Sequence, residues 1–517
     1  MNYKFWLHAS VLSVAMSAAA VAQAEITWAE KHYNPEPLAD DVILPMACGG
    51  AMAFRKVMVP LANPLDDYSV ELGQKSEEWG YIHSARPAFI SGSFTEKDKK
   101  SRYYLMAKYE TTQLQYNAML GKECVPSSNK LRLPAVDLSW MSAMHASDQY
   151  NLWLREHAAK ALPSEDGIQG FVRLPTEDEW EFAARGGIKV GQSEFRDTRY
   201  PMPEGLNSYE WFSGATSSNG KLQLSGLLKA NPLGLHDILG NASEMMFESF
   251  RLNKLQRSHG QAGGYVVRGG NFLMSSDDMT SASRREEAYY SQEGERSTKV
   301  NGFRLVLIAP ILTSRERVSS ISNEWKKLGS GSETDGSQET TAELAKITVS
   351  VEDTALKEKL DKVQKQLRSS NQLQEESQNK AIQASLQLGA FLCTKMQDDA
   401  IFVEHLEKSY ANYCSEEMYS DRCPGIKEKL DIQQERLAKL GIYYASSLID
   451  ASRYGYAALE RQVPMMEILI DANPRLKELK PFLSTHWQHQ QFYFKTQKIK
   501  SEQWVNNCKK LTQGAEQ

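Results

Sequence analysis

The stretch Gly234-Leu235-His236-Asp237-Ile238-Leu239-Gly240-Asn241-Ala242-Ser243-Glu244 organises the middle of this 517-residue chain. It combines the carboxylate or amide oxygens of Asp237, Asn241 and Glu244 with a glycine that permits a sharp turn. Such oxygens are the ligands that a hard cation such as calcium prefers. Taken alone, the stretch also fits an ordinary loop whose Asn and Asp side chains bond their own backbone.

The length and composition indicate a globular chain with more than one domain. A chain of 517 residues exceeds what one hydrophobic core usually serves. Its residues are 41% hydrophobic and 24% charged. A net charge of -5 gives no electrostatic reason to expect a nucleic-acid partner.

Residues 1–24 predict a secretory signal peptide. Lys4 supplies a positive start, an apolar run continues to Val21, and Ala22-Gln23-Ala24 has the small-x-small pattern of a cleavage site. We expect cleavage after Ala24 and a periplasmic mature chain. No later stretch has the apolar length that a membrane-spanning helix needs, so we expect no span. An uncleaved anchor is the alternative.

Six cysteines follow the signal peptide, and an oxidising compartment would let them form disulfides. Two lie early and four lie late in the chain. This division suggests one bridge in a first domain, Cys48 to Cys124, and two in a second domain. Because connectivity cannot be read from sequence, the second-domain pairs are a guess: Cys393 with Cys508, and Cys414 with Cys423.

Changes in composition suggest the domain boundaries. They are a tether over 25–41, a first domain over 42–312, a linker over 313–343 that is rich in Gly and Ser at 329–338, and a helical, disulfide-braced domain over 344–512. Near the start of the helical domain, Leu356, Leu360, Val363 and Leu367 follow the spacing of a coiled coil over about two heptads.

Local patterns predict several elements of the first domain. Strands are expected at Met52–Val59, Tyr103–Tyr109, Tyr265–Arg268 and Phe303–Leu307. Ser139 is expected to cap one helix, and Thr176 with Glu179 has the spacing of a capping box at the start of another. For the charged run Arg284–Glu287 we favour an exposed turn over a buried ion network.

Four pieces of sequence in a fixed order carry a family resemblance. They are Arg173–Gly187 (RLPTEDEWEFAARGG), Gly234–Glu244 (GLHDILGNASE), Val267–Asn271 (VRGGN) and Asn301–Leu305 (NGFRL). Together they resemble the formylglycine-generating enzyme, or sulfatase-modifying factor, domain over about Leu44 to Ala309. The resemblance implies an α+β architecture, with an irregular domain related to C-type lectin folds. An all-α helical domain follows it here.

The resemblance also implies a calcium site and says which atoms would form it. Side chains of Asp237 and Glu244 and main-chain carbonyls of Ile238, Gly240 and Ala242 would be the ligands. Ser243 stands where the family usually has Trp before this Glu.

The catalytic cysteines of the family have no counterpart here. Family members that make formylglycine use two cysteines to bind copper, and Met274 and Met279 stand near those positions. No cysteine lies between Cys124 and Cys393. Because thioethers cannot perform thiolate redox chemistry, we expect neither copper nor formylglycine formation.

Three hypotheses for function remain open. The first is an exported non-catalytic binding protein, a pseudoenzyme that recognises a protein partner in the cell envelope. The start Leu44–Gly50 resembles periplasmic regulators that act on the sensor domain of a type VI secretion kinase. The second is a periplasmic metal-dependent oxidoreductase, which needs convergence of His145, His157, His236 and His259. The third is a structural protein that self-associates through Leu356–Leu367.

Overall fold

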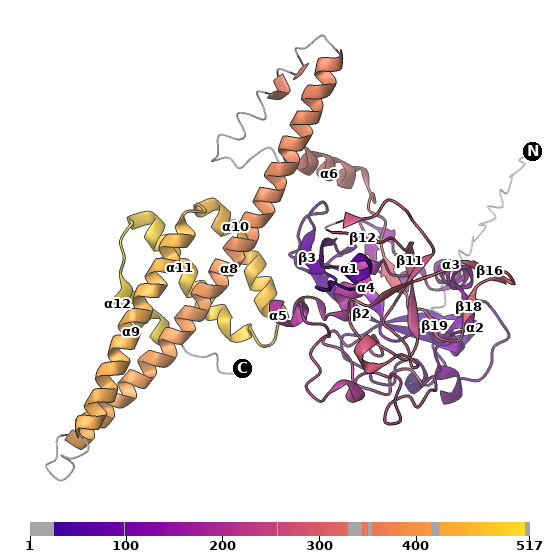
Figure 1. Cartoon of the computed structure of the whole chain (residues 1–517), viewed down its shortest axis with the longest axis horizontal. Coiled ribbons are helices and arrows are strands. Elements are labelled where there is room, and N and C mark those ends of the chain that lie inside the picture. Colours follow the sequence, from indigo (N-terminus) through magenta and orange to yellow (C-terminus); the bar gives the residue numbers. More distant parts are fainter. Residues whose placement is uncertain are drawn as a thin grey trace, which may run out of the picture.

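The computed structural model describes residues 25–511 apart from 98, 256, 329–343, 347, 350–353 and 415–422. The signal peptide over 1–24 and the Gly/Ser-rich segment 329–338 therefore lie outside the described residues. Figure 1 shows a rounded part made of strands and short helices beside an elongated group of helices. This is the α+β domain followed by an all-α region that the sequence predicts.

The first domain is built on two sheets among the described residues. The larger runs in the order β1 (Val42–Met46), β2 (Gly50–Val59), β6 (Arg102–Ala107), β20 (Val306–Ile308), β10 (Phe171–Arg173), with β5 (Phe94–Thr95) also on β6. The smaller has the order β15 (Arg284–Glu287), β14 (Tyr265–Arg268), β11 (Ser243–Ser249), β19 (Asn301–Gly302). Neighbours are antiparallel except for β11 with β19.

Short hairpins and pairs complete the β structure. They are β3 (Tyr68–Leu72) with β4 (Arg86–Ile90), β7 (Leu138–Ser139) with β18 (Ser297–Thr298), β8 (Ser164–Glu165) with β9 (Ile168–Gln169), β12 (Asn253–Lys254) with β13 (Arg257–Ser258), and β16 (Tyr290–Ser291) with β17 (Gly294–Glu295). Much of 187–242 has no long regular element, and the loop that will form the site lies in this part.

Capping side chains begin two helices of this domain, α3 and α4, as predicted. The helices are α1 (Gly80–His83), α2 (Gln113–Met119), α3 (Trp140–His157), α4 (Glu177–Ala184) and α5 (Gln192–Phe195). The Ser139 hydroxyl accepts from Ser142 N at the start of α3. Thr176 and Glu179 form the reciprocal capping box at the start of α4, which confirms that prediction.

Two expectations for this domain differ from the structure. Residues 25–41 pack onto the domain instead of forming a tether, because Trp28 is buried and Asp41 pairs with buried Lys108 at 2.8 Å. The strand expected at Phe303–Leu307 is broken into β19 and β20. Between them Arg304 turns inward, where its guanidinium bonds several backbone carbonyls.

The helical region contains α6 (Arg315–Lys327), α8 (Thr354–Cys414), α9 (Cys423–Ser452), α10 (Tyr456–Ala472), α11 (Lys480–Thr496) and α12 (Ser501–Lys509). Its core forms where Leu386, Tyr444 and Leu483 meet from α8, α9 and α11. No described helix combines the length and the apolar character that crossing a bilayer requires.

Disulfides join Cys48 to Cys124, Cys393 to Cys508, and Cys414 to Cys423. These are the pairs that the sequence suggested. The second links α8 to α12 across 115 residues of sequence, whereas the third spans only 9. Because a longer closed loop restricts the unfolded chain more, the second bridge has the larger expected effect on stability.

Replacing both Cys393 and Cys508 by Ala should therefore destabilise the helical region by about 5 kcal/mol on the chain-entropy account. Replacing Cys414 and Cys423 is the matched control, with an expected loss of about 2.5 kcal/mol. Denaturant unfolding followed by far-ultraviolet circular dichroism measures both. Equal losses for the two pairs would contradict the argument.

Candidate functional site

The loop Gly234–Glu244 surrounds a buried arginine from the other end of the domain. The Arg304 guanidinium donates to both carboxylate oxygens of Glu244 at 2.7 to 2.8 Å. It also donates to the backbone carbonyl oxygens of Ala107 and His236, each at 2.9 Å. Trp180 Nε1 donates to the same Glu244 carboxylate at 2.8 Å. One cation thus joins the loop, β6 and α4.

A second carboxylate holds the turn of the loop. Glu110 follows β6 and is buried, and its oxygens accept from Ala242 N at 2.8 Å and Asn241 Nδ2 at 2.7 Å. Asn241 has a positive φ of 50°. Gly240 has a φ of 129°, and a Cβ there would lie 2.4 Å from the carbonyl oxygen of Trp211. The turn therefore needs glycine at this position.

Asp237 is a loop carboxylate that can still accept a hydrogen bond or bind a cation. Its Oδ2 accepts from Gly226 N at 2.7 Å, while its Oδ1 is buried without a hydrogen-bond partner. Burial raises the pKa of Asp237 to about 6. Burial, with the negative charges of Asp237 and Glu244 nearby, also raises the pKa of Glu110. The site therefore concentrates acidic groups around one guanidinium.

The predicted calcium ligands fit this geometry only in part. Asp237 offers a free oxygen, but Glu244 does not fit as a ligand, because both of its oxygens accept from Arg304 and a calcium ion would lie beside that positive group. Within the described ranges, no group of three or more His, Cys, Asp or Glu side chains is placed to hold a metal ion. Calcium binding through Asp237, Ile238, Gly240, Ala242 and Glu244 stays a prediction.

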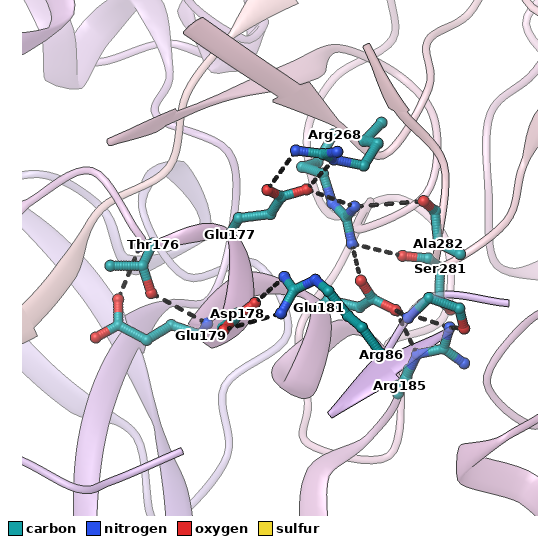
Figure 2. Close-up of polar contacts among 12 residues, drawn as sticks. Arg86, Thr176, Glu177, Asp178, Glu179, Glu181, Arg185, Arg268, Ser281 and Ala282 are labelled. Atoms are coloured by element: carbon teal, nitrogen blue, oxygen red, sulfur yellow. Dashed lines mark hydrogen bonds and ion pairs between the residues drawn. The ribbon is translucent and has the colours of Figure 1, made fainter. Parts of the chain in front are cut away.

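A second buried ion network lies between α4 and the smaller sheet. Arg268 on β14 donates to Glu177 at 3.0 Å and also to Glu181, while Arg284 on β15 pairs with Glu177. Figure 2 shows both carboxylates pointing toward Arg268, with Arg185 bonded to Glu181 from the other side. Although burial alone would raise it, Arg268 and Arg185 lower the pKa of Glu181 to about 2.

This network corrects the expectation for Arg284–Glu287. The run is strand β15 and not an exposed turn, and Arg284 is buried against Glu177. Alternation along the strand sends Arg284 to the buried face, whereas Arg285 faces the other way and donates to Ser243 Oγ at 2.8 Å. Because all four residues of the run are charged, the sequence shows no alternation of polar and apolar residues that would predict a strand here.

The two methionines that stand near the family's cysteine positions lie together beside Gly270. A Cβ at Gly270 would come within 2.9 Å of Met279 Sδ and 3.8 Å of Met274 Sδ. Met279 is fully buried and Met274 partly so. Ser243 borders this region, because its hydroxyl donates to the Gly270 carbonyl oxygen at 2.8 Å. The region offers thioethers and a hydroxyl, but no thiol.

The candidate histidines do not build a metal site in the described residues. His145 and His157 are exposed on α3. His236 is buried, where its ring contacts the Leu228 carbonyl oxygen at 2.8 Å and burial lowers its pKa to about 4. His259 lies on the loop after β13. The convergence that an oxidoreductase would need is absent among these described side chains.

Two further histidines face a tyrosine in the helical region. Nδ1 of His489 lies 2.8 Å and Nδ1 of His486 lies 3.1 Å from the Tyr444 hydroxyl. His489 Nε2 lies 3.0 Å from Asn507 Nδ2. Burial lowers the pKa of His486 to about 3 and of His489 to about 4. The two histidines, one helical turn apart on α11, therefore belong to a buried cluster around Tyr444 in which both imidazole rings are neutral.

Sequence reasoning missed the roles of Glu110, Arg268 and Arg304. Each stands in or beside a stretch expected to be a buried strand, within the motifs Lys108–Thr112, Val267–Asn271 and Asn301–Leu305. A charged residue within a stretch that must be buried needs an opposite charge, which is the signal that could have identified these residues.

The comparisons agree with the motifs. A family model described as sulfatase-modifying factor enzyme 1-like domain matches residues 71–309. A Mus musculus protein named inactive C-alpha-formylglycine-generating enzyme 2 is 28% identical over 177 residues, which cover 32% of this chain and 49% of that protein. The protein of the same name from Bos taurus is 26% identical over 34% of this chain and 50% of its own length. The chain spans about half the length of these relatives.

Two solved structures extend the comparison. Treponema denticola variable protein 1 has a TM-score of 0.39 and 19% identity, over 53% of this chain and 100% of its own. PvdO from Pseudomonas aeruginosa has a TM-score of 0.34 and 17% identity, over 49% of this chain and 94% of its own. Chaperone protein LppX from Paenibacillus barcinonensis is 26% identical over 187 residues, 30% of this chain and 66% of that protein.

Replacing Arg304 by Met should destabilise the domain by roughly 3–5 kcal/mol, because it leaves Glu244 buried without its cation. The control is Arg296→Met, which removes the more exposed pair with Glu287 and should cost less than about 1 kcal/mol. Denaturant unfolding followed by tryptophan fluorescence compares them. Similar midpoints for the two variants would refute a central role for Arg304.

Acid should destabilise the helical region through its buried histidines. His489 is neutral when folded, with its pKa near 4, whereas an unfolded histidine takes up a proton below about pH 6.5. The contribution of neutral His489 to the free energy of unfolding is thus fully present above pH 6.5 and is lost as the pH falls toward 4. In His489→Gln, the fall in melting temperature between pH 7 and pH 4 should be smaller than in the parent chain. If the melting temperature of His489→Gln fell as much as that of the parent chain, His489 would not be a cause of the destabilisation by acid.

Proposed function

Residues 71–309 belong to the sulfatase-modifying factor family, and from this premise we propose that the chain is an exported, non-catalytic binding protein. The observation that carries the proposal is the absence of any cysteine between Cys124 and Cys393, which removes the thiolates from this domain. Two relatives whose names call them inactive support the same reading. The three disulfides are consistent with export.

An exposed apolar face on the domain suits the recognition of a protein. Trp79 and Tyr81 are 47% and 51% exposed, and their ring centroids are 6.1 Å apart. Asn253 Nδ2 donates to the Ile82 carbonyl oxygen at 2.9 Å, which places β12, preceded by Leu252 and followed by Leu255, beside α1. Leu252 is 42% and Leu255 83% exposed. We call Trp79, Tyr81, Leu252 and Leu255 the α1 face.

The α1 face has the composition of a binding surface. Exposed aromatic and aliphatic side chains gathered at one place are uncommon on monomeric proteins and often mark interfaces. Trp and Tyr are also among the residues that contribute most to binding energy. The ion network behind this face holds it in place, since Arg284 Nη1 donates to the carbonyl oxygens of Ile82 and Arg251, each at 2.8 Å.

The partner that we propose is a protein of the cell envelope met in the periplasm after removal of residues 1–24. The resemblance of Leu44–Gly50 to periplasmic regulators makes the sensor domain of a type VI secretion threonine kinase the first candidate. Such a partner would place the domain in signalling across the envelope without any chemical step of its own.

Trp79→Ala should weaken binding of the mature chain to this partner at least tenfold, because it removes an anchor from the α1 face. Tyr290→Ala, which removes another exposed aromatic side chain from β16, is the matched control and should leave the affinity unchanged. Biolayer interferometry with the purified sensor domain measures both. No binding by the parent chain would reject this partner, and equal loss in both variants would reject the α1 face.

A further inference from the structure

Helix α8 carries two apolar stripes, of which the first is packed in the core that the described residues form, while the second has mostly exposed or half-buried side chains. Ile382, Leu386 and Ala390 are buried in the core formed with α9 to α12. The second stripe has two parts, each with steps of three and four residues, and all of its members are exposed or half-buried: Leu356, Leu360, Val363 and Leu367, then Ala381, Ala384, Leu388 and Phe391. Polar Ser370, Gln374 and Ser377 continue the same spacing between the two parts. Figure 1 shows the first half of α8 extending past α10 to α12, with α6 nearby.

The C-terminal half of the second stripe borders a groove between α8 and α9. The groove has a volume of about 540 Å³. Small residues line it, Ala381 and Ala384 on α8 with Ser446 and Ser447 on α9, while Leu388 and Tyr443 stand at its sides. Leu388 is 49% and Tyr443 67% exposed. Small residues let a third helix approach two packed helices closely.

The N-terminal half of the stripe has the side chains that such a groove could receive. Leu356 and Val363 are 47% and 50% exposed. Counted from position 372, Leu356 lies 16 residues before and Leu388 lies 16 after (372 - 356 = 388 - 372). In the same way Leu360 corresponds to Ala384, and Val363 to Ala381. Large residues on one side therefore match mostly small residues on the other.

This symmetry identifies the occupant as a second copy of the chain in the opposite direction. Antiparallel pairing inserts the large residues of each copy between the small residues of the other, so one two-fold contact fills both grooves. Parallel pairing would place large residues opposite large ones and small opposite small, which leaves the grooves open. The steps of three and four residues are those of a left-handed helix pair.

Charge favours the same direction. Lys357, Lys359, Lys362 and Lys365 flank the N-terminal half of the stripe, with Glu358 and Asp361 between them, so this half carries a net positive charge. Asp450 lines the groove and is 66% exposed, and it pairs with Arg453 of the next helical turn. Antiparallel pairing brings the lysines of one copy toward Asp450 of the other.

We propose that two copies of this protein associate through α8, antiparallel, with Leu356–Leu367 of each copy lying in the α8–α9 groove of the other. This inference does not rest on the proposed binding function, because it uses neither the first domain nor an external partner. It adds a symmetric dimer that would present two α1 faces.

The test begins with sedimentation velocity of the mature chain across micromolar concentrations. A dimer is expected, with Val363→Glu and Leu388→Glu each weakening association at least 100-fold. Both side chains are half-exposed, so helical content in circular dichroism should not change. Ile432→Glu is the matched control, since Ile432 is 58% exposed on α9 away from the groove, and it should remain dimeric. A monomeric parent chain, or dissociation of the control to the same extent, would overturn the proposal.

Disulfide trapping tests the direction of the pairing. Val363→Cys and Ala381→Cys copies, when mixed under mild oxidation, should form a linked heterodimer, while Val363→Cys alone should not link to itself. Self-linking of Val363→Cys would indicate parallel pairing and overturn the antiparallel arrangement.

Discussion

The loop Gly234–Glu244 at the centre of the first domain depends on one buried cation, the guanidinium of Arg304. It joins the carboxylate of Glu244 to backbone carbonyls of β6 and of the loop that precedes Glu244. A buried arginine is costly unless every donor is used and an opposite charge is present, and both conditions are met here. The requirement fixes where the loop, α4 and the break between β19 and β20 must lie. A long irregular segment can be ordered in this way without regular hydrogen-bonding ladders.

The sequence could predict the elements but not these connections. Caps at Ser139 and Thr176 and the strand Tyr265–Arg268 follow from local rules, and the structure has all three. The roles of Arg268 and Arg304 depend on partners 91 and 60 residues away, Glu177 and Glu244. The packing of Trp28 onto the core likewise depends on distant residues. Local pattern carries no information about such pairs, apart from the rule that a buried charge needs a partner.

The site keeps the framework of its family while its reactive groups differ. Carboxylates and arginines form closed networks that hold the loops, whereas the region beside Gly270 contains two thioethers and a serine hydroxyl. Such a domain retains a stable surface on which recognition can be built. Its helical extension, braced by a disulfide between α8 and α12, adds a second surface along α8 that the first domain lacks. We therefore propose that the chain acts through the shape of its surfaces and not through redox chemistry.

The measurement that tests this account most directly is mass spectrometry of a cysteine-containing peptide after incubation with the purified mature chain, Cu(I) and oxygen. We expect the peptide thiol to remain a thiol, with no product at the mass of the corresponding aldehyde. Formation of formylglycine in the peptide, absent from a control incubation without the protein, would contradict it.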